Sequence, residues 1–256
     1  MSTLNVALVQ SELHWADPAR NHAQLGVAME QARGADLFVL PEMFSTGFSM
    51  AAAELAEGMD GASVAWMRER AAALGAVVTG SLIIEEGGRF FNRLIWMRPN
   101  GEYSHYDKRH LFRMAGEHEH YASGASRLVV ELNGFRICPL VCYDLRFPVW
   151  SRCRNDYDVL LYVANWPARR REAWNALLKA RAIENLSYVI AVNRVGIDGN
   201  GHEYAGDSCV IDPAGQILSH REYAAGVDVQ VLKLEAVRAL REGFPAHLDA
   251  DRFHLD

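Results

Sequence analysis

The sequence predicts an α/β fold built around mixed β-sheets. In the first part of the chain, short apolar segments alternate with amphipathic helical segments, a pattern typical of parallel strands joined by helices. Between residues 77 and 106, strand-like segments are separated by hairpin-type turns, which favour antiparallel pairs. The 256 residues are 50% hydrophobic and contain no repeat, low-complexity tract or linker. We therefore expect one domain spanning residues 1–256, with a large buried core.

The N-terminal elements alternate between strand and helix. Residues 4–10 form an apolar segment of strand length, and Asp17-Pro18 then offers a helix N-cap followed by a first-turn proline. Residues 36–40 predict a second, short strand. Residues 63–74 carry apolar side chains at helical spacing, and Gly75 follows them as a typical helix end.

Strand patterns dominate the rest of the chain. They are expected at residues 77–84, 90–97, 103–106, 128–132, 136–142, 159–164, 188–192, 204–211, 216–218 and 227–234. The longest helix is predicted over residues 168–186, and a short helix precedes a polar tail. Residues 107–126 are predicted to be mainly loop.

Composition excludes several classes of function. The formal net charge is −6, and the basic block Arg169-Arg170-Arg171 precedes a helical pattern, so we expect no nucleic-acid partner. No apolar run approaches the roughly 18 residues of a membrane span, and the first residues lack the features of a signal peptide. The 4 cysteines fit neither a disulfide scaffold nor a zinc spacing. We expect a cytoplasmic protein with reduced thiols and no membrane partner.

A cysteine stands where a predicted strand ends. Cys142 closes the apolar segment that begins near residue 136, and Tyr143 and Asp144 follow it at once. In α/β enzymes a nucleophile is often exposed at such a strand end. Taken alone, a cysteine is more often a small buried hydrophobic residue.

Two further polar residues follow predicted strands. Glu42 comes after residues 36–40, and Lys108 comes after residues 103–106. Side chains just past strand ends converge on one edge of an α/β sheet. A thiol with an ordinary pKa of about 8.5 needs a base or a nearby cation to react at neutral pH. Glu42 can serve as that base, while Lys108 stabilises developing negative charge. Alternatively, Glu42 caps a loop and Lys108 is a solvated charge.

Three segments resemble the nitrilase superfamily of carbon–nitrogen hydrolases: LPEMF at 40–44, YDKRHLF at 106–112 and VCYDLRFP at 141–148. The order of glutamate, lysine and cysteine matches that family. The resemblance implies a four-layer αββα sandwich with two mixed β-sheets, commonly paired as a homodimer, and it requires no cofactor and no metal. It also implies that Glu117 is a further glutamate that positions the substrate and the lysine, although Glu119 lies close enough to compete for this assignment.

Within the superfamily, the chain is most similar to the ω-amidases. That resemblance implies hydrolysis of small 2-oxo acid amides, 2-oxoglutaramate and 2-oxosuccinamate, to the dicarboxylate and ammonia through a thioester. The backbone N–H of Tyr143 is expected to bind the oxyanion, and Arg146 is a candidate ligand for a substrate carboxylate or a structural ion-pair residue. Phe44 and Trp166 follow predicted strands, so they are candidate pocket walls or core residues.

Three alternatives stay open. The same chemistry could act on a nitrile, an N-carbamoyl amine or another small amide. Cys138 and Cys142 could instead form a C-x₃-C pair in a thiol-dependent binding or redox protein. His118 and His120 form an H-x-H pattern that would share a face in a strand, and this pair could bind a metal in a metal hydrolase.

Overall fold

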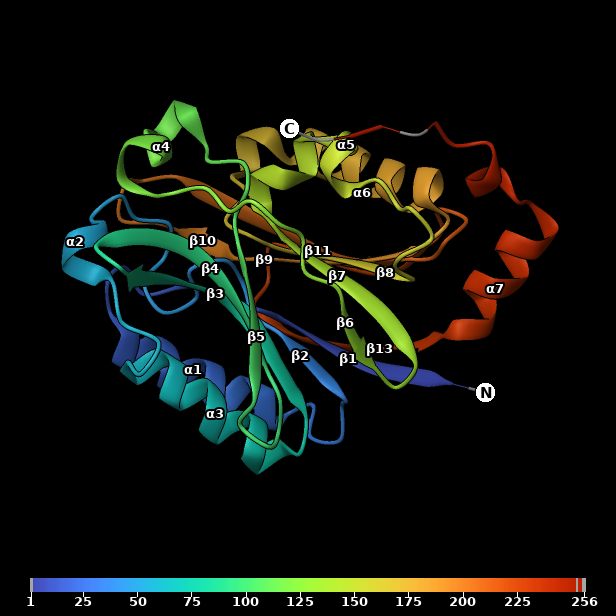
Figure 1. Ribbon diagram of the computed structural model, residues 1–256. Coiled ribbons are helices and arrows are strands. Elements are labelled where there is room, and N and C mark those ends of the chain that lie inside the picture. Colours follow the sequence, from blue (N-terminus) through green and yellow to red (C-terminus); the bar gives the residue numbers. More distant parts are fainter. Residues whose placement is uncertain (1, 252, 255–256) are drawn as a thin grey trace.

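Two β-sheets pack face to face, and helices cover the outer face of each sheet (Figure 1). The computed structural model describes residues 2–251 and 253–254. Both sheets contain parallel and antiparallel pairs. The predicted four-layer αββα sandwich with two mixed β-sheets is therefore confirmed.

The first sheet is 6-stranded, in the order β13-β1-β2-β3-β4-β5. Its strands are β1 (Thr3–Gln10), β2 (Leu37–Val39), β3 (Val77–Glu86), β4 (Arg89–Met97), β5 (Tyr103–Asp107) and β13 (Gly226–Lys233). Strands β1, β2 and β3 are parallel, and the others join as antiparallel neighbours. Helices α1 (Pro18–Glu30) and α3 (Ala62–Leu74) pack on its outer face, and the short α2 (Ala52–Leu55) follows the loop after β2.

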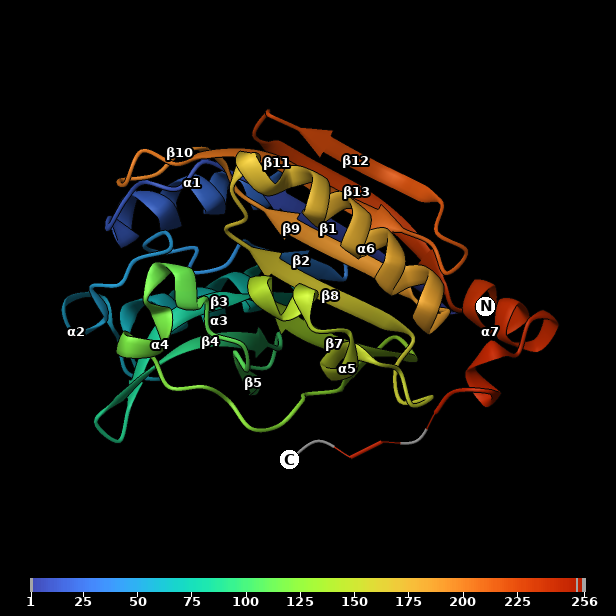
Figure 2. The same ribbon diagram turned by 90° about the horizontal axis from the view of Figure 1, so that it is seen from above.

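The second sheet is 7-stranded, in the order β10-β11-β9-β8-β7-β6, with β12 also paired to β11. Its strands are β6 (Val130–Leu132), β7 (Phe135–Val141), β8 (Val159–Ala164), β9 (Tyr188–Asn193), β10 (Val195–Ile197), β11 (Glu203–Ile211) and β12 (Ile217–Glu222). Its central strands β7, β8 and β9 are parallel. Seen from above, α6 (Arg171–Asn185) lies over this sheet and runs along the direction of its strands (Figure 2).

Short helices occupy the two ends of the molecule. Helices α4 (Glu117–His120) and α2 lie at one end, and α7 (Leu234–Gly243) lies at the other (Figures 1 and 2). Helix α5 (Pro148–Ser151) follows the turn after β7, and 3₁₀ helices cover Arg113–Ala115, Cys142–Arg146, Ala168–Arg170 and Ala246–Leu248. None of the helices in the described part of the chain combines the length and apolarity that a bilayer span requires.

The alternation of side chains along β1 divides the core into layers. Val6 and Leu8 belong to the cluster between the two sheets, while Ala7 and Val9 belong to the cluster beneath α1 and α3. Successive side chains of a strand point to opposite faces, so an entirely apolar strand can contribute to both layers. This explains why the strand patterns are continuous instead of alternating.

Local sequence signals account for the ends of the long helices. The Asp17 side chain accepts a hydrogen bond from the backbone N–H of Arg20 at 3.1 Å, and Pro18 occupies the first helical position. Gly75 ends α3 with a φ of 63°. The last long helix differs from its prediction, because residues 168–170 form a 3₁₀ turn before α6 begins at Arg171.

Two further segments differ from the sequence predictions. Residues 107–126 are not only loop, since they contain the 3₁₀ helix Arg113–Ala115 and α4. Strand β10 was not expected, and it pairs antiparallel with β11. These elements are three or four residues long. Tertiary contacts stabilise elements this short, because propensity and periodicity are too weak over such lengths.

Candidate active site

Cys142 begins the turn directly after β7, at the first residue of the 3₁₀ helix Cys142–Arg146. Its φ of 45° lies in the left-handed region, which costs a non-glycine residue on the order of 1–3 kcal/mol. The side chain is buried, and Sγ lies 3.9 Å from the backbone carbonyl oxygen of Asn165. The backbone thus holds the thiol in a single strained geometry at the C-terminal end of β7.

The Asp144 carboxylate fixes this turn. It accepts hydrogen bonds from the Val141 backbone N–H at 3.0 Å and from the Tyr106 hydroxyl at 2.7 Å. It also accepts one from the His110 backbone N–H at 3.0 Å, and Nδ1 of His110 lies 2.7 Å from the same carboxylate. Asp144 therefore joins the cysteine turn to the segment on both sides of Lys108.

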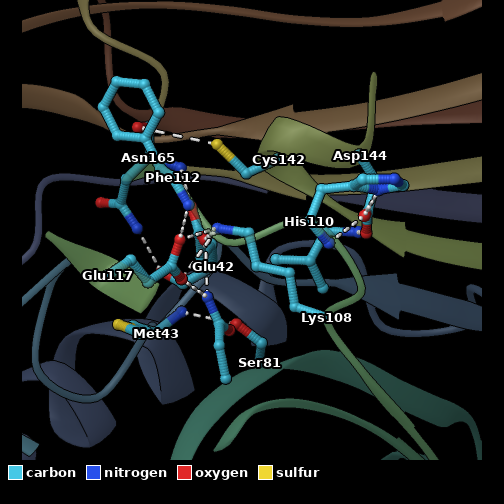
Figure 3. Close-up of polar contacts among 12 residues, drawn as sticks. Glu42, Met43, Ser81, Lys108, His110, Phe112, Glu117, Cys142, Asp144 and Asn165 are labelled. Atoms are coloured by element: carbon cyan, nitrogen blue, oxygen red, sulfur yellow. Dashed lines mark hydrogen bonds and ion pairs between the residues drawn. The ribbon is translucent and has the colours of Figure 1, made fainter. Parts of the chain in front are cut away.

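Glu42 is fully buried and lies at the centre of the polar cluster in Figure 3. Its Oε1 accepts hydrogen bonds from Lys108 Nζ at 2.8 Å and from the Asn92 side-chain amide at 2.7 Å. Its Oε2 accepts one from the Asn165 backbone N–H at 2.8 Å. Because these donors come from β4 and from the ends of β5 and β8, the carboxylate can hold only one orientation.

Lys108 bridges two buried carboxylates. Its Nζ lies 3.0 Å from each oxygen of Glu117, in addition to its contact with Glu42. Glu117 also accepts a hydrogen bond from the Phe112 backbone N–H at 2.5 Å. Glu119 is exposed on the same short helix. The structure thus brings Glu117, and not Glu119, to the lysine.

Burial and charge set the protonation of this cluster. Burial alone would lower the pKa of Lys108, but the carboxylates of Glu117 and Glu42 outweigh it and hold the pKa well above its usual range. The pKa of Glu117 is raised by burial and by the neighbouring Glu42. One ammonium between two carboxylates leaves an excess of negative charge, which disfavours a further anion nearby.

The pKa of the Cys142 thiol is raised well above its usual range, first by burial and then by the Glu42 carboxylate, with Lys108 offsetting part of the effect. A thiolate therefore does not accumulate before substrate arrives. The sulfur must lose its proton during its attack, and a carboxylate base beside the thiol can accept that proton.

A cavity of about 290 Å³ opens above this cluster. Cys142 and Lys108 line it, as do three residues predicted to bind substrate: Tyr143, Arg146 and Trp166. Aromatic rings that the sequence did not single out, Phe48 and Phe112, line it as well. A volume of this size accommodates a small molecule only.

The prediction that Phe44 walls the pocket is wrong. Phe44 is fully buried in the core beneath α1 and α3, with its ring 5.6 Å from that of Trp66. Met43 turns the chain with a φ of 42°, which sends the next side chain away from Glu42. A Cβ at Gly80 would lie 2.8 Å from the Phe44 ring, so the missing side chain of the glycine provides the space that Phe44 fills.

The His118–His120 pattern lies on the short helix α4 and not on a strand, so these side chains do not share a face. Within the described residues, the only group with three metal-ligating side chains close enough to meet one ion lies elsewhere, at Asp207, His220 and Glu222. Arg171 forms ion pairs with both carboxylates of that group.

Sequence reasoning missed Asn92, Asn165 and Asp144 as site residues. Asn92 is a single amide within the apolar β4, fully buried, and its side chain donates to Glu42 and to Glu117 at 3.2 Å. An amide inside a largely apolar strand was the available signal, because a buried amide requires hydrogen-bond partners.

Comparison with known proteins agrees with this geometry. Residues 5–242 match the carbon-nitrogen hydrolase family model. The chain is 49% identical to the ω-amidase YafV of Escherichia coli K12 over 100% of both chains, and 31% identical to the 2-oxoglutaramate amidase of Bacillus subtilis over 95% of this chain and 96% of that one. A crystal structure of a CN-hydrolase superfamily protein from Xanthomonas campestris, with an arsenic adduct in its active site, superposes with a TM-score of 0.98 at 49% identity over 100% of both chains. The chain belongs to the carbon–nitrogen hydrolase family of the nitrilase superfamily.

Proposed function

We propose that this enzyme hydrolyses the terminal amide of small 2-oxo acid amides, 2-oxoglutaramate and 2-oxosuccinamate, to the dicarboxylate and ammonia. The observation that carries the proposal is the placement of Cys142 beside the Glu42–Lys108–Glu117 cluster at the base of a cavity of about 290 Å³. Relatives that are 49% and 31% identical carry the names ω-amidase and 2-oxoglutaramate amidase, which supports this substrate class.

In the first half of the reaction, Cys142 Sγ attacks the amide carbon while Glu42 accepts the thiol proton. The C–S bond forms as the C=O π bond of the amide breaks, and its electron pair gives the former carbonyl oxygen a negative charge. The Lys108 ammonium and the backbone N–H of Tyr143 are the donors for that oxyanion. Glu42 then returns its proton to the nitrogen, the C–N bond breaks, ammonia leaves and a thioester remains on Cys142.

In the second half, water hydrolyses the thioester. Glu42, again ionised, accepts a proton from the water as its oxygen attacks the thioester carbon. The same donors bind the second oxyanion, and the C–S bond then breaks as the sulfur regains the proton from Glu42. The fixed orientation of the Glu42 carboxylate serves both halves, since its oxygens are held by Lys108 and Asn165.

A thiol-exchange role for a Cys138–Cys142 pair has less support. Cys138 is fully buried in the core cluster around the second sheet, and burial raises the pKa of its thiol to about 12. Cys138 also lies within β7 and does not line the cavity, whereas Cys142 lines it and has the Glu42 carboxylate as a neighbouring base. A buried thiol without access to a reaction partner is inert.

Ammonia release from a panel of substrates tests the proposed substrate class. The panel contains 2-oxoglutaramate, 2-oxosuccinamate, a short aliphatic nitrile and an N-carbamoyl amine, each supplied to the purified enzyme. We expect the highest kcat/KM for the 2-oxo acid amides. A higher kcat/KM for the nitrile or the N-carbamoyl amine would assign the same cysteine chemistry to that substrate instead. Assembly as a homodimer stays a prediction from the family resemblance, and placement in the cytoplasm stays a prediction from the cysteine content and the sequence pattern.

A further inference from the structure

The Arg170 side chain lines the cavity that Cys142 also lines. It belongs to the 3₁₀ turn Ala168–Arg170, between the end of β8 and the start of α6. Its guanidinium lies 5.0 Å from the centre of the Phe112 ring. The Trp166 indole donates a hydrogen bond to the Arg170 backbone oxygen at 2.9 Å. Trp166 therefore holds the backbone of this turn, and Phe112 packs against the half-buried Arg170 side chain.

Arg146 also packs against an aromatic ring, that of Trp166. Its guanidinium lies 5.0 Å from the centre of the Trp166 ring, and it also lines the cavity. The two guanidiniums come from turns after β7 and β8, neighbouring parallel strands of the second sheet. A stacked guanidinium keeps its planar fork of donors free for a second partner.

Neither guanidinium has an acidic partner among the residues that the structure describes. No carboxylate oxygen there lies within 4.0 Å of Arg146 or Arg170, whereas the adjacent Arg171 pairs with Asp207 at 2.7 Å. Asp198 also lines the cavity, but its carboxylate already accepts hydrogen bonds from the Tyr204 hydroxyl and from the backbone of its own loop. Burial lowers the pKa of Arg170, and the neighbouring Arg169 and Arg146 lower it further. The cavity therefore holds two guanidiniums that no acidic side chain of the described residues pairs with.

We propose that Arg170 determines specificity by binding, together with Arg146, the carboxylate at the far end of an acidic amide substrate. The inference rests on the proposed function and adds the residue that selects acidic over neutral amides. A substrate whose amide carbon reaches Cys142 would place its carboxylate between the two guanidiniums, away from the negatively charged Glu42–Lys108–Glu117 cluster. Bidentate hydrogen bonds from a guanidinium to a carboxylate are among the strongest in proteins, and preorganised stacking lowers their entropic cost.

The test compares two substrates that differ only at this end. 2-Oxoglutaramate carries the carboxylate, and 4-oxopentanamide has a methyl group in its place. The measured quantity is the ratio of kcat/KM for the acidic amide to kcat/KM for the neutral amide. We expect Arg170→Gln to lower this ratio about 10- to 100-fold, mainly through the KM of the acidic amide, since a charged hydrogen-bond partner is lost.

Arg169→Gln is the matched control. Arg169 is the neighbouring arginine, is exposed and lines the same cavity, but no aromatic ring in the described chain is stacked against it. We expect this variant to keep the wild-type ratio. An equal loss in both variants would show that only the general positive field matters, and an unchanged ratio in Arg170→Gln would also overturn the assignment. If Arg170→Gln is unstable, Arg170→Met replaces it, because methionine keeps an unbranched side chain packed against Phe112. The same ratio of kcat/KM values is then measured for that variant.

The outcome for the wild-type enzyme separates this inference from the proposed function. A wild-type ratio near one would contradict the proposed class of acidic substrates itself. A wild-type preference for the acidic amide that survives in both Arg170 variants would leave the proposed function standing and remove Arg170 from it.

Discussion

At the residue scale, the Lys108 ammonium is the group on which the site depends electrostatically. It is buried between the carboxylates of Glu42 and Glu117, at 2.8 and 3.0 Å. A buried charge without a partner is strongly destabilising, so each member of this cluster requires the others. In the proposed mechanism, the same ammonium donates a hydrogen bond to the oxyanion that forms at Cys142.

Replacing Lys108 should therefore affect turnover much more than binding. We expect Lys108→Ala to lower kcat by about 100- to 1,000-fold, the usual effect of removing one donor to an oxyanion, with a smaller change in KM. Steady-state ammonia release with 2-oxoglutaramate measures both constants. A kcat equal to that of the wild type would mean that Lys108 is structural only.

Loss of the lysine also leaves two buried carboxylates side by side, so folding must be checked separately. We expect Lys108→Met to have the same kinetic effect while preserving more of the packing, because its unbranched side chain fills similar space. Thermal unfolding of both variants distinguishes a catalytic loss from a general loss of the native state.

Single residues at strand ends were the part of the site that could be predicted from the sequence. Glu42, Lys108 and Cys142 each follow a strand, and the structure brings Glu42 and Lys108 to 2.8 Å of each other. The position of Phe44 could not be predicted from its place after a strand. The positive φ of Met43 turns the chain, so the Phe44 side chain points away from the site. A sequence pattern shows which residues are apolar, but it does not show in which direction a side chain points after a turn.

At the scale of elements, the Asp144 carboxylate links the turn after β7 to the segment after β5. Its oxygens accept hydrogen bonds from the backbone N–H groups of Val141 and His110 and from the Tyr106 hydroxyl. The indole of Trp150 donates in turn to the Tyr106 hydroxyl at 3.0 Å. This network holds the strained turn at Cys142 in register with Lys108.

Asp144→Asn should weaken that link. An amide nitrogen would face the hydroxyl or N–H donors that now point at a carboxylate oxygen, leaving buried donors without acceptors. We expect a loss of about 2–4 kcal/mol in the free energy of unfolding, together with a lower kcat. Urea unfolding and steady-state kinetics measure the two effects.

Asp228→Asn is the control for this change, since Asp228 pairs with Arg221 at 2.6 Å with 28% of each side chain exposed. Such exposed pairs contribute about 0–1 kcal/mol. Equal destabilisation of the two variants would show that the Asp144 network has no special role in holding the turn.

The long elements could be predicted from the sequence because their signals are local. The Asp17-Pro18 start of α1 and the Gly75 end of α3 are where the sequence placed them. Helix α4 and strand β10 could not be predicted. Their residues are ordered by contacts with distant segments, such as the pairing of β10 with β11 and the contact of Glu117 with Lys108.

At the scale of the whole molecule, the core buries two thiols, Cys138 and Cys209, that do not line the cavity. Cys138 lies on β7 and Cys209 lies on β11, and both belong to the core cluster around the second sheet. Burial raises the pKa of each of these thiols to about 12. In the unfolded chain a thiol ionises near its ordinary pKa of about 8.5.

This difference predicts a loss of stability at alkaline pH. Below the unfolded pKa both states keep the thiol proton, so the free energy of unfolding is unaffected. Between about 9 and 12 the unfolded state binds fewer protons than the native state, and the free energy of unfolding falls by up to about 1.4 kcal/mol per pH unit for each thiol. Urea unfolding from pH 7 upwards measures the slope.

Cys209→Ala should reduce this slope, and Val210→Ala serves as its control. Val210 is fully buried at the next position of β11, so its truncation should lower stability at every pH without changing the dependence on pH. Identical slopes in the wild type and Cys209→Ala would contradict the role given to this thiol.

The layered architecture as a whole followed from the family resemblance more than from the strand pattern. Alternating strands and helices and the hairpins predicted mixed sheets, and both sheets are mixed. The pattern alone did not establish how the strands divide between two sheets. That division depends on long-range pairings such as β1 with β13, which join the two ends of the chain.

The central claim is that Cys142 is the nucleophile for amide hydrolysis. Its most direct test is ammonia release from 2-oxoglutaramate by the wild type, by Cys142→Ala and by Cys138→Ala, with each protein shown to be folded. The account predicts turnover by the wild type and by Cys138→Ala, and none by Cys142→Ala. Turnover retained in pure Cys142→Ala protein would contradict it.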